Sequence, residues 1–155
     1  MSEQKPDKRQ KKSSARLFAV QALFQMEAAG QTVDKVRTEF YNHRFGVPID
    51  GNEMIEPNAD LFHAITEDAV NSQKPIDQMT DRALVAKWPI ARIDPTLRAL
   101  FRAAGAEFLM KKTPAKVVIV EYVQVATAFY PEGKESKFVN AVLDHMAREA
   151  QPEEF

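Results

Sequence analysis

The sequence predicts an all-α protein of about seven helices. Three observations carry this prediction: apolar residues recur at helical spacing along most of the chain, capping residues precede those stripes, and Gly or Pro follows them. The 155 residues are enough for one domain with its own core. Apolar residues make up 45% of the chain and charged residues 28%, as in an ordinary globular protein.

The N-terminal segment is polar and basic. Residues 1–16 hold six Lys or Arg side chains against two acids, although the whole chain has a net charge of -1. We expect residues 1–12 to form a mobile basic arm. Such an arm either seeks phosphate groups or is a solvated end that only aids solubility. The six cations are Lys5, Lys8, Arg9, Lys11, Lys12 and Arg16.

The first half of the chain predicts four helices. The first helix begins at Ser13 or Ser14 and ends before Gly30, and the second runs from Val33 to about residue 45. Turn-forming residues crowd the segment 46–57 and predict the longest ordered loop. The third and fourth helices follow, with apolar stripes at Leu61, Phe62, Ile65 and Ala69 and at Ile76, Met79, Ala83 and Leu84.

The second half predicts three more helices. Pro75 opens the fourth helix, Trp88 and Pro89 break it, and a boundary between two lobes is expected near residues 73–75. Asp94 and Pro95 are a cap and first-turn pair for the fifth helix. The last helix has its apolar face at Phe138, Val139, Val142, Leu143 and Met146, and the tail from Gln151 is expected to fray.

The segment 117–125 is ambiguous by composition alone, because its β-branched residues favour a strand. Thr113 and Pro114 resemble a helix cap and first turn. Glu121 and Gln124 share one face of a helix, whereas a strand would place them on opposite faces. We therefore predict a buried helix, in which Glu121 pairs with an Arg such as Arg98 or Arg102 or with a protein partner.

Several classes of protein are disfavoured by what the sequence lacks. Without cysteine there is no disulfide or thiolate site, no apolar run is long enough to span a bilayer, and the charged start does not look like a secretory signal. His43, His63 and His145 fall on different predicted helices without metal-ligand spacing. No glycine-rich nucleotide loop occurs either. We expect a cytoplasmic, non-enzymatic protein without a metal or cofactor.

Five separated segments resemble the NusB family in order and spacing. The first is residues 15–24, whose most specific part is AVQALF at 19–24, another is TPAKVVIVE at 113–121, and the clearest is KFVNAVLD at 137–144. The segment 98–108 and the pattern of Trp88 with Arg92-Ile93 are also similar. The resemblance covers nearly all of residues 13–149. Three positions depart from the family pattern, namely Val120, Glu135 and Ala141.

The resemblance implies two packed helical bundles, here about 13–73 and 74–149. It also implies a transcription antitermination factor that binds single-stranded boxA-type RNA of rRNA leaders with NusE, a small-subunit ribosomal protein, in the RNA polymerase antitermination complex. Both monomers and homodimers occur in the family. Two alternatives stay open: a purely protein-binding helical adaptor, and an RNA-binding module that works with a separate rRNA-modifying enzyme.

Basic and aromatic side chains are the expected contacts with single-stranded RNA, because cations bind phosphates and rings stack on bases. Lys11, Lys12 and Arg16 supply positive charge at the start of the first predicted helix. Phe24 and Phe138 have an alternative role in packing, which for Phe24 is the favoured one. Asn140, among apolar neighbours, is expected to cap backbone or to bind RNA. The candidate RNA-binding residues are Arg9, Lys11, Lys12, Arg16, Phe24, Phe129, Lys134, Lys137 and Phe138.

Overall fold

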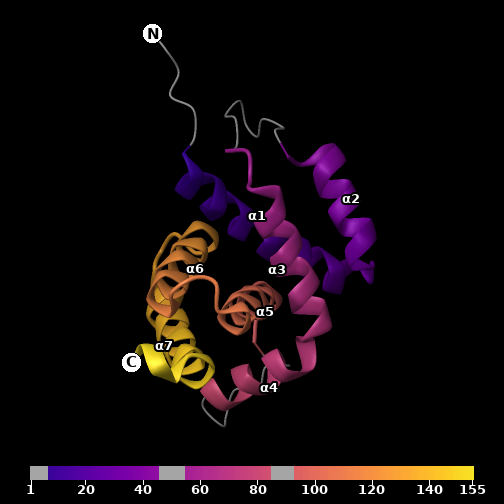
Figure 1. Cartoon of the computed structure of the whole chain (residues 1–155). Helices are drawn as coiled ribbons and strands as arrows, with labels where there is room; N and C mark the ends of the chain where they lie inside the picture. The colour runs from indigo at the N-terminus through magenta and orange to yellow at the C-terminus, as the bar shows by residue number, and fades with distance from the viewer. Residues whose placement is uncertain (1–6, 46–54, 85–92) are drawn as a thin grey trace.

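The structure is a computed structural model that describes residues 7–45, 55–84 and 93–155 (Figure 1). These ranges contain seven α-helices, one short 3-10 helix and no strand, which confirms the all-α prediction. No helix in them is long and apolar enough to cross a lipid bilayer. The elements are α1 Lys8–Ala29, α2 Val33–His43, α3 Ala59–Asn71, α4 Gln73–Ala83, α5 Pro95–Met110, α6 Ala115–Phe129, α7 Lys134–Ala150 and η2 Pro152–Glu154.

Helix α5 lies at the centre of the fold and contacts α1, α3, α4, α6 and α7 (Figure 1). Its middle is a run of small buried residues, 103–106, which lets neighbouring helices approach closely. At Gly105 the neighbouring helix approaches closely, because a Cβ placed there would lie 2.4 Å from Cγ2 of Ile76 on α4. The composition of α5 therefore fits its central position.

The core is continuous across the predicted lobe boundary. Phe18, Phe40 and Phe62 join α1, α2 and α3 through ring contacts, with centroids 6.1 Å apart for Phe18 and Phe40 and 5.8 Å apart for Phe40 and Phe62. Among the described residues, buried side chains from both predicted lobes belong to one core cluster. Ser72 alone separates α3 from α4. The division into lobes at 73–74 thus stays a prediction, and the two halves share a core.

Helix α1 begins earlier than the sequence analysis expected. Asp7 Oδ1 accepts a hydrogen bond from the Gln10 backbone N–H at 2.8 Å, and Gln10 Oε1 accepts one from the Asp7 N–H at 2.9 Å. This capping box starts the helix at Lys8. Residues 8–12 are therefore helical, whereas the sequence analysis expected them in an arm outside the first helix, because the Asp7 side chain caps the helix before them.

The predicted fraying of the C-terminal tail is also wrong. Gln151 is 2% exposed and donates from Nε2 to the Phe108 carbonyl at 2.9 Å. The Glu154 carboxylate accepts from the backbone N–H of Ala115 at 3.1 Å, at the start of α6. Pro114, the N-cap of α6, has no side-chain hydrogen bond to that helix, so Glu154 supplies the missing cap.

Two other local predictions are confirmed. Asp94 Oδ1 accepts from the Thr96 N–H at 2.7 Å, and α5 begins at Pro95. The β-branched segment 117–125 is helical, within α6. Most of the predicted loop, at 46–54, lies outside the described residues, as do Trp88, Pro89 and Arg92.

Candidate nucleic-acid interface

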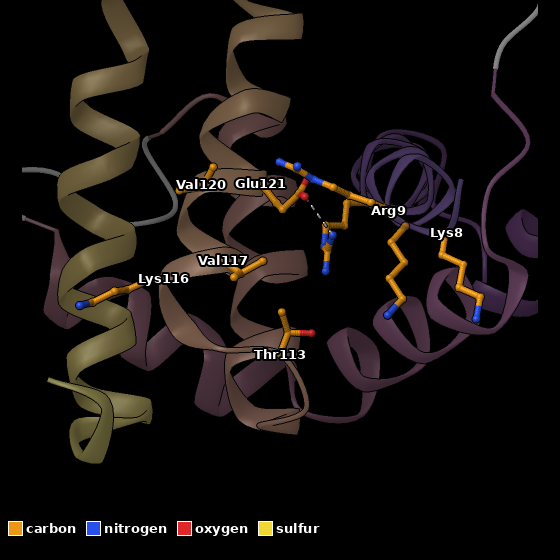
Figure 2. A pocket seen from close by; sticks show the side chains of 9 residues that line it. Lys8, Arg9, Thr113, Lys116, Val117, Val120 and Glu121 are labelled. Carbon is orange, nitrogen blue, oxygen red and sulfur yellow. Dashed lines mark ion pairs between the residues drawn. The ribbon is translucent and has the colours of Figure 1, made fainter. Parts of the chain in front are cut away.

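A groove of about 550 Å³ lies between the first turns of α1 and α6. Figure 2 shows Lys8 and Arg9 on the α1 side and Val117 and Val120 on the α6 side. Lys116 also borders the groove, although in this view its side chain extends away from α1. The groove thus has a basic wall and an apolar wall. Its lining residues are Lys8, Arg9, Lys12, Arg16, Thr113, Lys116, Val117, Val120 and Glu121.

Beneath the groove, a buried ion pair joins α1 to α5. Arg16 is 3% exposed, and its guanidinium contacts the Glu107 carboxylate through Nε at 2.6 Å and Nη2 at 3.1 Å. Tyr122 of α6 donates its hydroxyl to the same carboxylate at 2.8 Å. The network therefore fixes α1 and α6, which frame the groove, relative to the central helix α5.

A second carboxylate shares the same guanidinium. Glu121 Oε1 lies 3.6 Å from Arg16 Nη1, and Glu121 Oε2 accepts from the Ser13 hydroxyl at 2.8 Å. Burial alone would lower the pKa of Arg16, but the hydrogen bond and charge of Glu107 outweigh it, and the pKa is raised. Burial, and then the charge of Glu107, raises the pKa of Tyr122 well above 10. Arg16 is therefore charged and Tyr122 neutral at physiological pH.

Two further hollows follow α1. One of about 680 Å³ lies beside its first turns, where Arg9 and Glu121 line both this hollow and the groove. Another of about 340 Å³ lies toward the other end of α1 and is lined by Phe24, Phe129 and Arg44, among others. The groove and the first hollow therefore both lie at the first turns of α1, where the exposed cations are, and the hollow lined by Phe24 and Phe129 lies toward the other end of the helix.

The structure brings only some of the predicted cations together. Arg9 and Lys12 are exposed and line the groove. Lys11 is half-buried and lines none of the three hollows, and its carbonyl accepts from the Asn58 N–H at 2.9 Å. Arg16 is a correction, because its buried guanidinium is engaged by Glu107 and Glu121 and is not free for phosphate. Charge in the sequence does not distinguish an exposed cation from a buried one.

The structure also places the predicted aromatic residues in two different environments. Phe24 is 38% exposed and Phe129 half-buried at one hollow, so the favoured packing role of Phe24 leaves part of its ring open. Phe138 instead packs on the core, with its ring centroid 6.3 Å from that of Phe101. Lys134 and Lys137 are exposed at the start of α7 and line none of the three hollows.

Sequence reasoning missed part of the site and misassigned two polar residues. Glu121 pairs with Arg16, whereas Arg98 contacts Glu27 and Arg102 contacts Asp77 at 2.9 Å. Asn140 is exposed on α7, so it is not a buried amide. Lys8 was among the predicted cations of the basic arm, and the groove residues that the sequence analysis missed are Thr113, Lys116, Val117 and Val120. Lys116 and Val117 lie about one turn before Val120 on α6, and that spacing was the available signal.

In the described ranges, no three His, Asp or Glu side chains are placed to hold a metal ion. The arrangement instead offers exposed cations and partly open aromatic rings along α1, a helix more than twenty residues long, with the Glu121 carboxylate of α6 lining the groove. Such a surface suits an extended chain of phosphates and planar bases better than a compact substrate, because cations can contact the phosphates and aromatic rings can stack on the bases.

Comparisons with known proteins agree on one family. A family model described as the NusB family matches residues 13–148. The chain is 46% identical over 143 residues to the transcription antitermination protein NusB of Maricaulis maris (strain MCS10), covering 92% of this chain and 89% of that one. It is 43% identical over 144 residues to the protein of the same name from Mesorhizobium japonicum, covering 92% of each.

Solved structures share the fold. NusB from T. maritima matches with a TM-score of 0.73 and 26% sequence identity, covering 98% of this chain and 99% of that one. A chain in a structure of the antitermination factors NusB and NusE in complex with dsRNA matches with a TM-score of 0.73 and 23% identity, covering 92% and 99%. The helical arrangement is therefore similar over nearly the whole length of each chain.

Proposed function

Because this chain belongs to the NusB family of transcription antitermination proteins, which are not enzymes, we propose that it binds single-stranded boxA-type RNA of rRNA leaders together with NusE. In this role it supports rRNA transcription within an RNA polymerase antitermination complex in the cytoplasm. Family membership supports the class of function, and the surface along α1 supports RNA as the ligand.

The observation that carries the proposal is the basic groove at the start of α1. Lys8, Arg9 and Lys12 are exposed there on one end of a helix, on a chain whose net charge is -1. Each phosphate that such side chains neutralise releases counterions, which adds about 0.7 to the salt slope for a single strand. Binding in this groove is therefore expected to weaken steeply with salt.

The hollow lined by Phe24 and Phe129 supports an RNA strand rather than a mononucleotide as the ligand. Phe24 follows Lys12 by twelve residues on the same helix, which is a rise of about 18 Å. Phe129 of α6 lines the same hollow. An RNA strand that follows α1 can place phosphates at Lys8 and Lys12 and stack a base near Phe24, and each stack contributes about 1–3 kcal/mol.

NusE as the protein partner is proposed from the family alone. The similar chain solved with NusE and dsRNA is only 23% identical to this one, and it supports the fold rather than particular contacts. Lys134 and Lys137 are exposed on α7, away from the hollows of α1. A role for them in RNA binding requires a strand that continues beyond Phe129.

The test is fluorescence anisotropy of a labelled boxA-type RNA against a scrambled RNA, in a salt series, with and without NusE. Wild-type protein is expected to prefer the boxA-type RNA, and NusE is expected to tighten the complex. The variant Lys8→Glu with Lys12→Glu should weaken binding and lower the salt slope by about 1.4 if each Lys neutralises one phosphate.

The matched control is Lys35→Glu with Lys74→Glu, which makes the same charge change at exposed positions on α2 and α4. Phe24→Ala and Phe129→Ala should reduce affinity without changing the salt slope, because they remove stacking rather than charge. Equally weak binding of both RNAs, unchanged by NusE and by the Phe24→Ala and Phe129→Ala substitutions, would contradict the proposal and favour a helical adaptor whose biological partner is a protein.

A further inference from the structure

Glu121 is an unexpected side chain for a groove that binds phosphates. Among the residues that the structure describes, it is the one carboxylate that lines the groove, and it is 5% exposed. It also lines the neighbouring hollow beside the first turns of α1. Figure 2 shows it extending from α6 toward α1, where the dashed line marks its ion pair. The negative charge of Glu121 would repel a phosphate at this point. The part of the groove at Glu121 therefore suits a ligand group other than phosphate, whereas the exposed Lys8 and Lys12 at the edge of the groove suit phosphates.

The carboxylate of Glu121 retains hydrogen-bonding capacity. A carboxylate has about four lone-pair sites, and the Ser13 hydroxyl occupies one of them at 2.8 Å. Arg16 Nη1 lies at 3.6 Å, which is beyond hydrogen-bond length, because Glu107 holds the same guanidinium through two bonds. One guanidinium therefore faces two carboxylates, and Glu121 is the one that borders open space.

A ligand group that satisfies Glu121 must donate hydrogen bonds, because the carboxylate only accepts. Uracil presents its N3–H between two carbonyl oxygens, which the carboxylate repels. Cytosine and adenine present an amino group beside a ring nitrogen that accepts. Guanine presents its N1–H and its N2 amino group side by side, which matches the two oxygens of a carboxylate.

The apolar wall provides a place for the ring. Val117 and Val120 are 44% and 52% exposed, and both border the groove on α6 within one turn of Glu121. A base edge at Glu121 therefore lies beside an apolar surface that can cover its face, while Lys8 and Lys12 remain at the rim for the flanking phosphates.

We propose that Glu121 is the base-reading residue of this groove and accepts hydrogen bonds from N1–H and the N2 amino group of one unpaired guanine. This inference rests on the proposed function, because it needs RNA in the groove. It adds the base that the groove selects and the residue that selects it.

The test uses uridine decamers of equal length and charge that carry at one position guanosine, inosine, 1-methylguanosine or uridine. Inosine lacks the N2 amino group, and the methyl group of 1-methylguanosine removes the N1–H. The wild-type protein should bind the guanosine decamer about tenfold more tightly than either analogue, since one charge-assisted hydrogen bond of about 1.4 kcal/mol is a factor of ten. All four decamers should share one salt slope.

Glu121→Gln keeps the size of the side chain and an acceptor for Ser13, and it should reduce the preference for guanosine to about twofold or less, because a neutral amide offers one acceptor oxygen. Glu132→Gln, at an exposed position before α7, makes the same chemical change and should leave the preference intact. Should Glu121→Gln fail to fold, the RNA analogues on the wild-type protein still decide the question.

Two outcomes overturn the inference and leave the proposed function standing: equal binding of guanosine, inosine and 1-methylguanosine decamers, or an unchanged guanosine preference in Glu121→Gln. In both cases the variant Lys8→Glu with Lys12→Glu still weakens all the decamers. If that variant binds every decamer like the wild type, RNA does not occupy the groove, and the proposed RNA site fails together with the inference.

Discussion

Replacing Arg16 with Met tests whether the buried ion network holds the groove together. Arg16 is 3% exposed and Glu107 is fully buried, and their two contacts measure 2.6 and 3.1 Å. Removing one partner of such a pair costs about 3–5 kcal/mol, because the remaining charge is left without compensation. For a domain of this size, that cost lowers Tm by roughly 6–20 °C.

The assay is urea unfolding at pH 7, followed by circular dichroism and repeated for Arg16→Met, for Arg16→Met with Glu107→Gln, and for the wild type. The double variant should recover at least about 2 kcal/mol of the loss, because a neutral amide is cheaper to bury than an unpaired carboxylate.

A loss below about 1 kcal/mol in Arg16→Met, the range of an exposed ion pair, would refute this reasoning. So would a double variant no more stable than the single one.

Three further predictions concern packing, capping and titration. Gly105→Ala should destabilise the fold by about 1–3 kcal/mol in thermal melts, because its Cβ would lie 2.4 Å from Ile76 Cγ2; exposed Ala128→Ser is the control and should melt like the wild type. Glu154→Gln should cost about 0.5–1 kcal/mol and speed amide exchange in the first turn of α6, since it weakens the cap on the Ala115 N–H; equal exchange in both proteins would argue against that cap. Burial, followed by the charge of Asp94, raises the pKa of Tyr130 to about 12. Because the folded value lies above the unfolded value of 10, Tyr130 contributes stability below pH 10 that is lost between pH 10 and about 12, and Tyr130→Phe should flatten that fall in stability, as followed by unfolding at a series of pH values.

The candidate site was only partly accessible from the sequence. The positive charge at the start of the first helix was visible, as was Phe24 at its far end, because both are properties of single residues or of helical spacing. Lys116, Val117 and Val120 were missed because their relevance depends on α6 lying beside α1. Glu121 was noticed, but its partner was misassigned to α5.

Local signals account for what the sequence determined. The start of α5 at Pro95 follows from Asp94, which caps the Thr96 N–H two residues later. The helical state of 117–125 follows from Glu121 and Gln124, which share a face in a helix but not in a strand. The early start of α1 at Lys8 belongs to this class too, because its capping box spans residues 7–10 and was overlooked. Such interactions join residues a few positions apart, so they can be identified without the fold.

The tertiary structure alone decided which charges are buried and which are exposed. Arg16 and Lys12 both look like free cations in the sequence, but Arg16 meets Glu107 across 91 positions and Lys12 does not. The same holds for Glu154, which caps α6 across 39 positions. The physical reason is that long-range pairs form only after many apolar contacts have fixed which helix faces meet, and no single residue carries that information.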